Sequence, residues 1–161
     1  TEIMARPGNT LVFDSSKTPG EILDLMVVNS KVLKDNPKLG QALVGAWYET
    51  IALMKAGDPK ALAHMAKASG ATVEEFKGML ATTHMYWTPA EALAAYNSPD
   101  LVKTNDLVRK FSFEKGLLGD GAKSADAVGI EFPGGKTLGS SSNIRMRFDP
   151  TYVKLAADGK L

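Results

Sequence analysis

The chain has 161 residues, 44% hydrophobic and 23% charged, a composition typical of an ordinary globular domain and not of a disordered or fibrous protein. Its 19 basic and 18 acidic residues give a net charge of +1 and are interspersed, so the cation clusters that bind nucleic acid are missing. Because the sequence has no cysteine, disulfides, thiolate metal sites and thiol nucleophiles are excluded. A self-contained domain of this length is expected to bury about 70% of its unfolded surface.

Two apolar runs near the start of the chain, Thr10–Phe13 and Leu25–Val28, predict β-strands. Each run ends in polar residues, and the turn signal Pro19-Gly20 separates them. Their apolar residues are continuous and do not alternate, which is typical of strands covered on both faces in a parallel sheet. Two strands cannot form such a sheet by themselves. We therefore expect that neighbouring strands are missing from this chain.

The middle of the chain predicts a series of short helices, because start and stop signals recur there. A polar residue before proline is a start signal, Thr72 with Glu75 is a capping box, and glycine is a stop signal. The expected starts are Asn36, Asp58, Thr72, Thr88 and Ser98, and the expected stops are Gly57, Gly70 and Gly116.

The carboxyl-terminal part of the chain predicts strands again. Residues 127–132 and 144–148 alternate in polarity as strands do, with a Gly134-Gly135 turn and a polar loop over residues 139–143 between them. Asp149-Pro150 then predicts the start of a last helix, which is expected to stop near Gly159.

The segment Gly116–Ser124 is similar in composition to a phosphate-binding loop. Its spacing is wrong, because Ala122 separates the last glycine from Lys123, and the segment follows a predicted helix instead of a strand. We expect a helix end followed by a loop. The two histidines, His64 and His84, have no second ligand four residues away, so we expect no metal site and no cofactor.

Aromatic residues occur at two places in the helical region. Trp47 lies inside the longest predicted helix, and Trp87 ends the aromatic sequence that starts at His84. Core packing is the favoured role of both tryptophans, because aromatic side chains bury large areas. The alternative is that either indole lines a pocket. In the last predicted strand Arg145 and Arg147 share one face, which favours a solvated surface over an anion site.

The polar loop after the first predicted strand is a candidate binding site. Asp14, Ser15 and Ser16 follow that strand directly, and Glu21 follows the turn. Ligands of open α/β sheets bind just beyond the carboxyl ends of the strands. Two carboxylates and two hydroxyls suit a small polar or cationic solute, because charge-assisted hydrogen bonds are strong and directional. A capped turn would explain the same residues without a ligand, and the composition leaves both interpretations open.

Four segments of the chain, residues 13–22, 26–29, 45–50 and 111–119, resemble the periplasmic solute-binding proteins of ABC importers. The similarity is to the nitrate/sulfonate/taurine-type class. Within that class it is to the branch associated with urea carboxylase, for which urea or guanidine is the suspected solute. The resemblance extends over essentially the whole chain and is more specific for the family than for the ligand.

The resemblance implies an α/β protein with the two-lobed fold of type II periplasmic binding proteins, which closes on its solute by a hinge motion. Family members are much longer than this chain, so the chain would supply the helix-rich carboxyl-terminal half. An amino-terminal half with a signal peptide, and the permease subunits of the importer, would be its partners. Residues 1–20 would form the end of the second lobe and the hinge crossing. Residues 21–161 would form the carboxyl-terminal part of the first lobe, with its helical cover and carboxyl-terminal strands.

The residues and the resemblance together predict a periplasmic solute-binding subunit and not an enzyme. Carboxylates would accept hydrogen bonds from the solute, hydroxyls would orient it, and an indole would stack on a flat cation. Asp14 and Glu21 are the expected carboxylates. Ser15 and Ser16 are the expected hydroxyls, and the indole is that of Trp47 or Trp87. Two alternatives stay open: an enzyme of the same fold, similar to cofactor-precursor synthases, and a freestanding helical interaction module.

Overall fold

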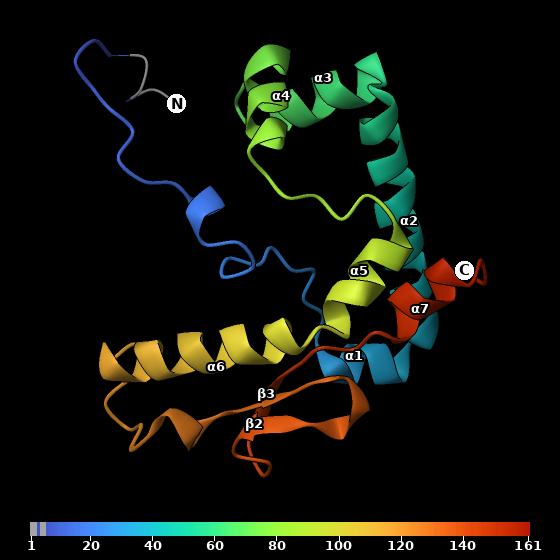
Figure 1. Cartoon of the computed structure of the whole chain (residues 1–161). Helices are drawn as coiled ribbons and strands as arrows, with labels where there is room; N and C mark the ends of the chain where they lie inside the picture. The colour runs from blue at the N-terminus through green and yellow to red at the C-terminus, as the bar shows by residue number, and fades with distance from the viewer. Residues whose placement is uncertain (1–2, 4–5) are drawn as a thin grey trace.

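The computed structural model describes residue 3 and residues 6–161. Within them the chain is mostly helical, with one small three-stranded sheet (Figure 1). The helices are α1 (Ser30–Asp35), α2 (Pro37–Ala56), α3 (Pro59–Ala68), α4 (Val73–Ala81), α5 (Pro89–Tyr96), α6 (Pro99–Glu114) and α7 (Thr151–Ala157). The strands are β1 (Gly129–Glu131), β2 (Thr137–Gly139) and β3 (Ile144–Arg147), and short 3-10 turns are η1 (Ser15–Lys17), η2 (Ala125–Ala127) and η3 (Pro133–Gly135).

The predicted helix boundaries are confirmed, and local hydrogen bonds explain them. Thr72 and Glu75 form the capping box at the start of α4. Asp58 accepts a hydrogen bond of 2.8 Å from the amide of Ala61 at the start of α3. α2 ends at Gly57, whose φ of 71° is left-handed. None of the helices in the described part of the chain is long and apolar enough to cross a bilayer.

The sheet has the strand order β2-β1-β3. β1 pairs antiparallel with β2, which places Ile130 opposite Leu138, and parallel with β3, which places Ile130 opposite Met146. The sequence predicts β1 and β3, which lie within the alternating runs 127–132 and 144–148, but not β2, which lies between these runs. The expected Gly134-Gly135 turn and polar loop are both present, but β2 lies between them, and the chain then returns parallel to β1.

The fully buried hydrophobic residues of the described chain fall into two groups. Phe132, Phe148 and Val153 lie where the sheet meets α7, and Ile51, Leu62 and Ala66 lie on α2 and α3. The rings of Phe132 and Phe148 stack with their centroids 5.3 Å apart, and Tyr96 of α5 meets Phe148 edge-on at 6.2 Å. The end of the sheet, α5 and α7 therefore form the main aromatic core.

α7 packs against α2 at Gly40, which is buried. A Cβ atom on Gly40 would lie 2.3 Å from Cζ of Tyr152 in α7. Glycine inside a helix costs about 1 kcal/mol relative to alanine, so a reason for its presence is needed. The reason is that only glycine lets the Tyr152 ring lie directly on the α2 backbone. This contact joins the start of the helical region to the last helix (Figure 1).

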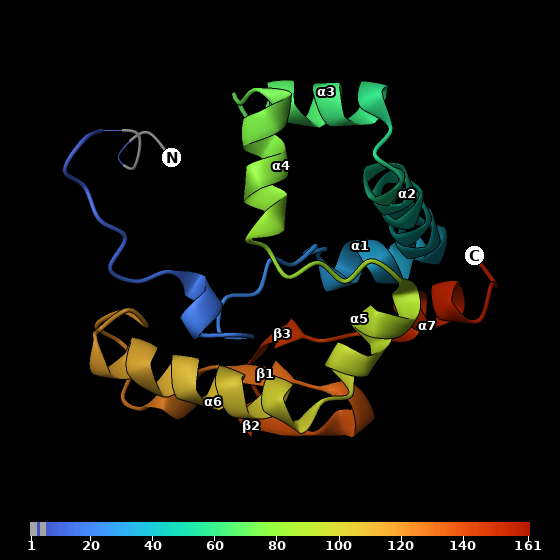
Figure 2. The same cartoon turned by 45° about the horizontal axis from the view of Figure 1, so that its top comes forward.

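The two predicted amino-terminal strands do not form a sheet. Residues 9–14 and 23–29 have no regular secondary structure, and residues 10–13 and 24–28 make no backbone hydrogen bond within the described chain. The prediction of buried strands is wrong for this chain, since Val12 is 94% and Val27 79% exposed. The physical reason is that no pairing strand lies beside them. Figures 1 and 2 show the segment before α1 as a trace that runs apart from α3 and α4.

The chain also exposes more surface than its length predicts. Its accessible surface is 11456 Å², whereas a compact monomer of 17.2 kDa exposes about 7,800 Å². It buries only a little more than half of the roughly 24,900 Å² that an unfolded chain of this mass exposes, not the expected 70%. The amino-terminal segment and the projecting pair α3 and α4 explain this open shape (Figure 2).

Candidate functional site

Asp14 caps the short turn η1 with its own side chain. One of its carboxylate oxygens accepts hydrogen bonds from the Ser16 hydroxyl and from the Ser16 amide, the latter at 2.9 Å. The hydroxyl first, and then the amide, hold the pKa of Asp14 below its usual value. The turn explains the sequence Asp14-Ser15-Ser16 locally. The other carboxylate oxygen accepts no hydrogen bond from the described residues, so a role of Asp14 in binding stays a prediction.

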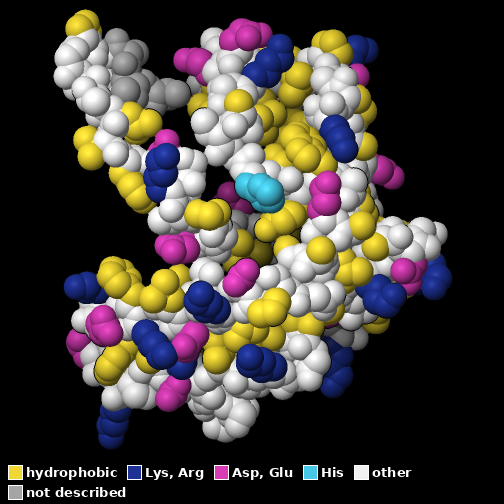
Figure 3. All heavy atoms as spheres, viewed as in Figure 1, with side chains coloured by type: hydrophobic (Ala, Val, Ile, Leu, Met, Phe, Trp, Pro, Cys, Tyr) yellow, Lys and Arg dark blue, Asp and Glu magenta, His cyan; other side chains and the backbone are white. Residues whose placement is uncertain are grey.

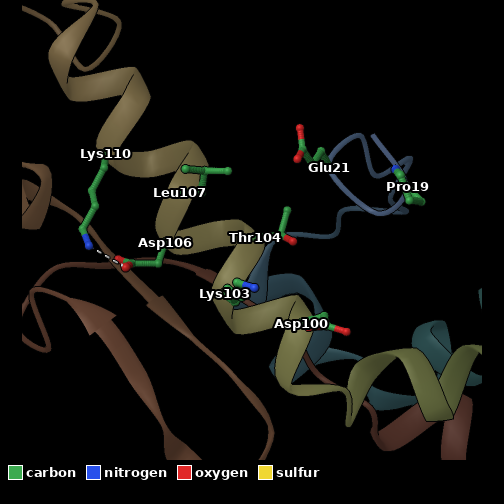
Figure 4. A pocket seen from close by; sticks show the side chains of 8 residues that line it. All are labelled: Pro19, Glu21, Asp100, Lys103, Thr104, Asp106, Leu107 and Lys110. Carbon is green, nitrogen blue, oxygen red and sulfur yellow. Dashed lines mark hydrogen bonds and ion pairs between the residues drawn. The ribbon is translucent and has the colours of Figure 1, made fainter. Parts of the chain in front are cut away.

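A cavity of about 440 Å³ lies between the loop that contains Pro19 and Glu21 and one side of α6 (Figure 4). α6 contributes the residues of this wall from Asp100 to Lys110. Figure 4 shows Glu21 on the loop and Thr104 on the helix across from each other. This cavity is a groove open to solvent and not an enclosed site. Of the predicted site residues, the structure brings only Glu21 to this cavity.

The charged side chains that line the cavity differ in whether they have a partner. Nζ of Lys110 lies 2.7 Å from Oδ2 of Asp106, and hydrogen bonds from Lys110 and Arg109 lower the pKa of Asp106. Glu21 and Lys103, in contrast, form no ion pair within the described chain. Asp100 likewise forms no ion pair within the described chain, so the cavity offers a ligand two acceptors, Glu21 and Asp100, and one donor, Lys103, whose charges are not already neutralised.

Arg109 connects the cavity wall to the rest of the fold. Its guanidinium pairs with Asp106 on α6 at 2.7 Å, pairs with Asp126 in η2, and donates a hydrogen bond of 3.1 Å to the carbonyl of Ala125. The side chain is only 12% exposed, unlike most ion-paired side chains in the described chain. A partly buried network of this kind fixes geometry more than an exposed pair does. Arg109 thereby positions α6 against the segment that leads into the sheet.

The two tryptophans do not line this cavity. Trp47 on α2 is 47% exposed, so core packing does not account for its whole side chain. Trp87 is half-buried in the segment before α5. Close to it in sequence, the rings of His84 and Tyr86 meet edge-on with their centroids 5.2 Å apart. Stacking of either indole on a solute stays a prediction.

The loop after α6 and the two arginines of β3 have the structural roles that the sequence favours. The segment after α6 is a loop, and Gly116 with a φ of 72° ends the helix. Within the described residues no group of three or more histidine and carboxylate side chains is arranged to hold a metal ion. Arg145 and Arg147 are both exposed, and Arg147 lies 3.4 Å from Glu131.

Three residues of the cavity, Asp100, Lys103 and Thr104, are not predicted by the sequence. They lie on a helix whose start signal is clear, but charged and hydroxyl side chains on a helix are typical of a solvated face. Only their position opposite Glu21, which is far away in the sequence, distinguishes them from residues of an ordinary solvated helix face. No local pattern could have identified them.

Comparison of the chain with family models, curated proteins and solved structures found no match. The fold is a mostly helical domain with a small mixed sheet, and no known fold is assigned to it. A function for the chain therefore has to be argued from the cavity, from the extended segments and from the residues themselves.

Proposed function

We propose that the chain is the carboxyl-terminal part of a two-lobed solute-binding protein that delivers a small nitrogen-rich solute, such as urea or guanidine, to the permease of an ABC importer in the periplasm. The observation that carries this proposal is the cavity in which the unpaired carboxylate of Glu21 lies across from Thr104. The resemblance of residues 13–22, 26–29, 45–50 and 111–119 to such proteins also supports it. Binding, and not bond breaking, is the proposed task.

The chemistry of the cavity suits a planar solute with several N–H groups. The Glu21 carboxylate can accept two parallel N–H bonds, as carboxylates do from planar donors, and the Thr104 hydroxyl can accept a third. Lys103 provides a donor, which the carbonyl oxygen of urea can use and a guanidinium ion cannot. Lys103 therefore suits urea, whereas the two unpaired carboxylates, Glu21 and Asp100, suit a guanidinium ion.

The proposed division into lobes is the one that the resemblance implies. Residues 1–20 belong to the end of the second lobe and the hinge crossing, and residues 21–161 belong to the first lobe. Gly20, with a φ of 80°, gives the crossing a turn directly before Glu21. Closure of the second lobe over the cavity would remove water from it and strengthen each hydrogen bond to the solute.

The proposal is tested by calorimetric titration with urea and with guanidinium, preceded by a native mass spectrum that shows which polypeptides and solutes the isolated protein retains. Glu21→Gln should weaken the binding of guanidinium at least about tenfold, because a hydrogen bond to a charged group contributes about 1.5–3 kcal/mol. Asp14 does not line the cavity, so Asp14→Asn tests the separate prediction that Asp14 is a ligand, and it should leave the fold intact. Glu114→Gln, which changes an exposed carboxylate of α6 outside the cavity, is the matched control and should have no effect.

Two results would contradict the proposal. If neither solute binds to a protein that contains both lobes, the cavity is not the site of such a solute. If Glu21→Gln and Glu114→Gln bind equally well, Glu21 is not a ligand. A mostly helical, folded monomer that is indifferent to solutes would favour the helical interaction module instead, and turnover of a solute would favour the enzyme.

A further inference from the structure

We propose that residues 10–13 and 25–28 are docking strands, which pair with apolar β-strands of a polypeptide segment outside residues 1–161. The inference specifies how the second part of the proposed binding protein joins this chain, and in that respect it rests on the proposed function. It depends on different residues, however: the docking strands and not the cavity.

The first argument is the state of the backbone. Residues 10–13 and 24–28 form no backbone hydrogen bond within the described chain. Valine, isoleucine and phenylalanine favour strands because their side chains pack well on a pleated surface. An extended segment with free N–H and C=O groups is the template that a further strand uses when it adds to a sheet edge. Residues 10–13 and 25–28 have no regular secondary structure and no backbone hydrogen bond within the described chain, so their N–H and C=O groups are free for such pairing.

The second argument is that both faces of each docking strand are apolar. Successive side chains of a strand point to opposite faces. Val12 is 94% exposed, and its neighbours Leu11 and Phe13 on the other face are 57% and 61% exposed. In the second docking strand Met26 is 49% and Val27 79% exposed. A partner that covers only one face would leave half of these side chains in water, so the partner has to supply layers on both sides of a sheet.

The third argument is the area. The chain exposes roughly 3,700 Å² more than a compact protein of its mass. Interfaces of obligate complexes bury about 2,000–5,000 Å², whereas transient contacts bury far less. The docking strands account for a part of this excess, and the projecting pair α3 and α4 for another part, so the area agrees with a partner on the docking strands but does not fix the size of the interface.

These observations identify the occupant as a polypeptide. A lipid layer would cover the apolar side chains, but it would leave the backbone N–H and C=O groups without partners, which costs several kcal/mol for each group. A second copy of this chain is also disfavoured. Two copies related by a two-fold axis pair an edge strand with itself in antiparallel fashion, and strands of antiparallel sheets usually alternate in polarity. The continuous apolar runs suit a parallel sheet.

α6 extends the same apolar surface. Leu107 and Phe111 are 57% and 53% exposed, and Leu107 lines the cavity together with Pro19 of the loop between the docking strands. Figure 3 shows hydrophobic side chains both along the amino-terminal segment and along the α6 region that faces the viewer.

Photo-cross-linking in the cells that make the protein tests the inference. A photoreactive phenylalanine analogue replaces Val12 or Val27, with Lys123 in the exposed loop after α6 as the control position. We expect the positions of Val12 and Val27 to cross-link to apolar, β-prone peptides outside residues 1–161, and the control position to give no such product. Cross-links to a second copy of this chain, or the same products at all three positions, would overturn the inference.

Amide hydrogen exchange then tests the pairing itself. In the protein as isolated from those cells, the amides of the docking strands should exchange at least about 100-fold more slowly than in residues 1–161 produced alone. Val12→Pro and Val27→Pro remove one ladder donor each and should abolish this protection, whereas Lys123→Pro should not. Equal exchange rates in the two preparations would contradict the inference. Protection without solute binding would refute the proposed function only, and solute binding without protection would refute only the docking strands.

Discussion

The two apolar, β-prone regions of this chain have opposite fates. In the region of the sheet, Phe148 is 6% exposed and stacks on Phe132. In the amino-terminal region, Phe13 is 61% exposed and makes no comparable contact with another ring. Residue type does not explain the difference, because both regions are rich in strand-forming residues. A short strand is buried where neighbouring strands pair with it and stays exposed where none does.

The largest expected effect is a difference between two phenylalanine truncations. Phe148→Ala removes a ring from the aromatic core and should lower the free energy of unfolding by about 3–5 kcal/mol. Phe13→Ala should lower it by less than about 0.5 kcal/mol in residues 1–161, because the side chain is mainly in water. Urea unfolding followed by circular dichroism measures both values. Losses of equal size would show that the amino-terminal segment is folded into the core in solution.

A second comparison uses two glycines inside helices. Gly40→Ala forces a methyl group into the Tyr152 ring and should destabilise the protein by about 1–3 kcal/mol. Gly78→Ala in α4 adds a methyl group where no atom lies within 4 Å, so it should stabilise by roughly 0.5–1 kcal/mol through helix propensity. The same urea titrations compare the two variants. A neutral Gly40→Ala would mean that α7 does not pack on α2 as described.

The smallest expected effect concerns acid stability. The pKa values of Asp106 and Asp14 both lie below their usual values in the folded chain. A carboxylate of this kind stabilises the fold above its unfolded pKa of about 3.9, and this stability is lost as the pH falls through the folded pKa. Asp106 is joined to Arg109 and thereby to η2, whereas Asp14 bonds only within its own turn.

Asp106→Asn should therefore reduce the drop in Tm on acidification below about pH 4, and Asp14→Asn should leave that drop unchanged. Thermal scans at several pH values measure the difference. If only Asp14→Asn changed how Tm depends on pH, the turn η1 would have to unfold together with the rest of the protein. The amino-terminal region would then not be independent of the core.

The sequence predicts a feature well when the residues that interact to form it lie close together in the chain. Asp58 and Thr72 cap their helices through atoms three residues away, and the sequence predicts both. β2 is not predicted, because its three residues become a strand only through their pairing with β1. Among the candidate site residues, the turn at Asp14 is local and predictable. The position of Glu21 opposite Thr104 is not, because it depends on how the loop lies against α6.

The sequence by itself determined the helix boundaries, because neighbouring residues carry the hydrogen-bonding groups that cap each helix. Only the tertiary structure decided which extended runs are buried, that β3 runs parallel to β1, and that the Tyr152 ring lies on Gly40. Each of these features is a contact between residues that are far apart in the chain. A local sequence pattern does not show which distant residues will contact it.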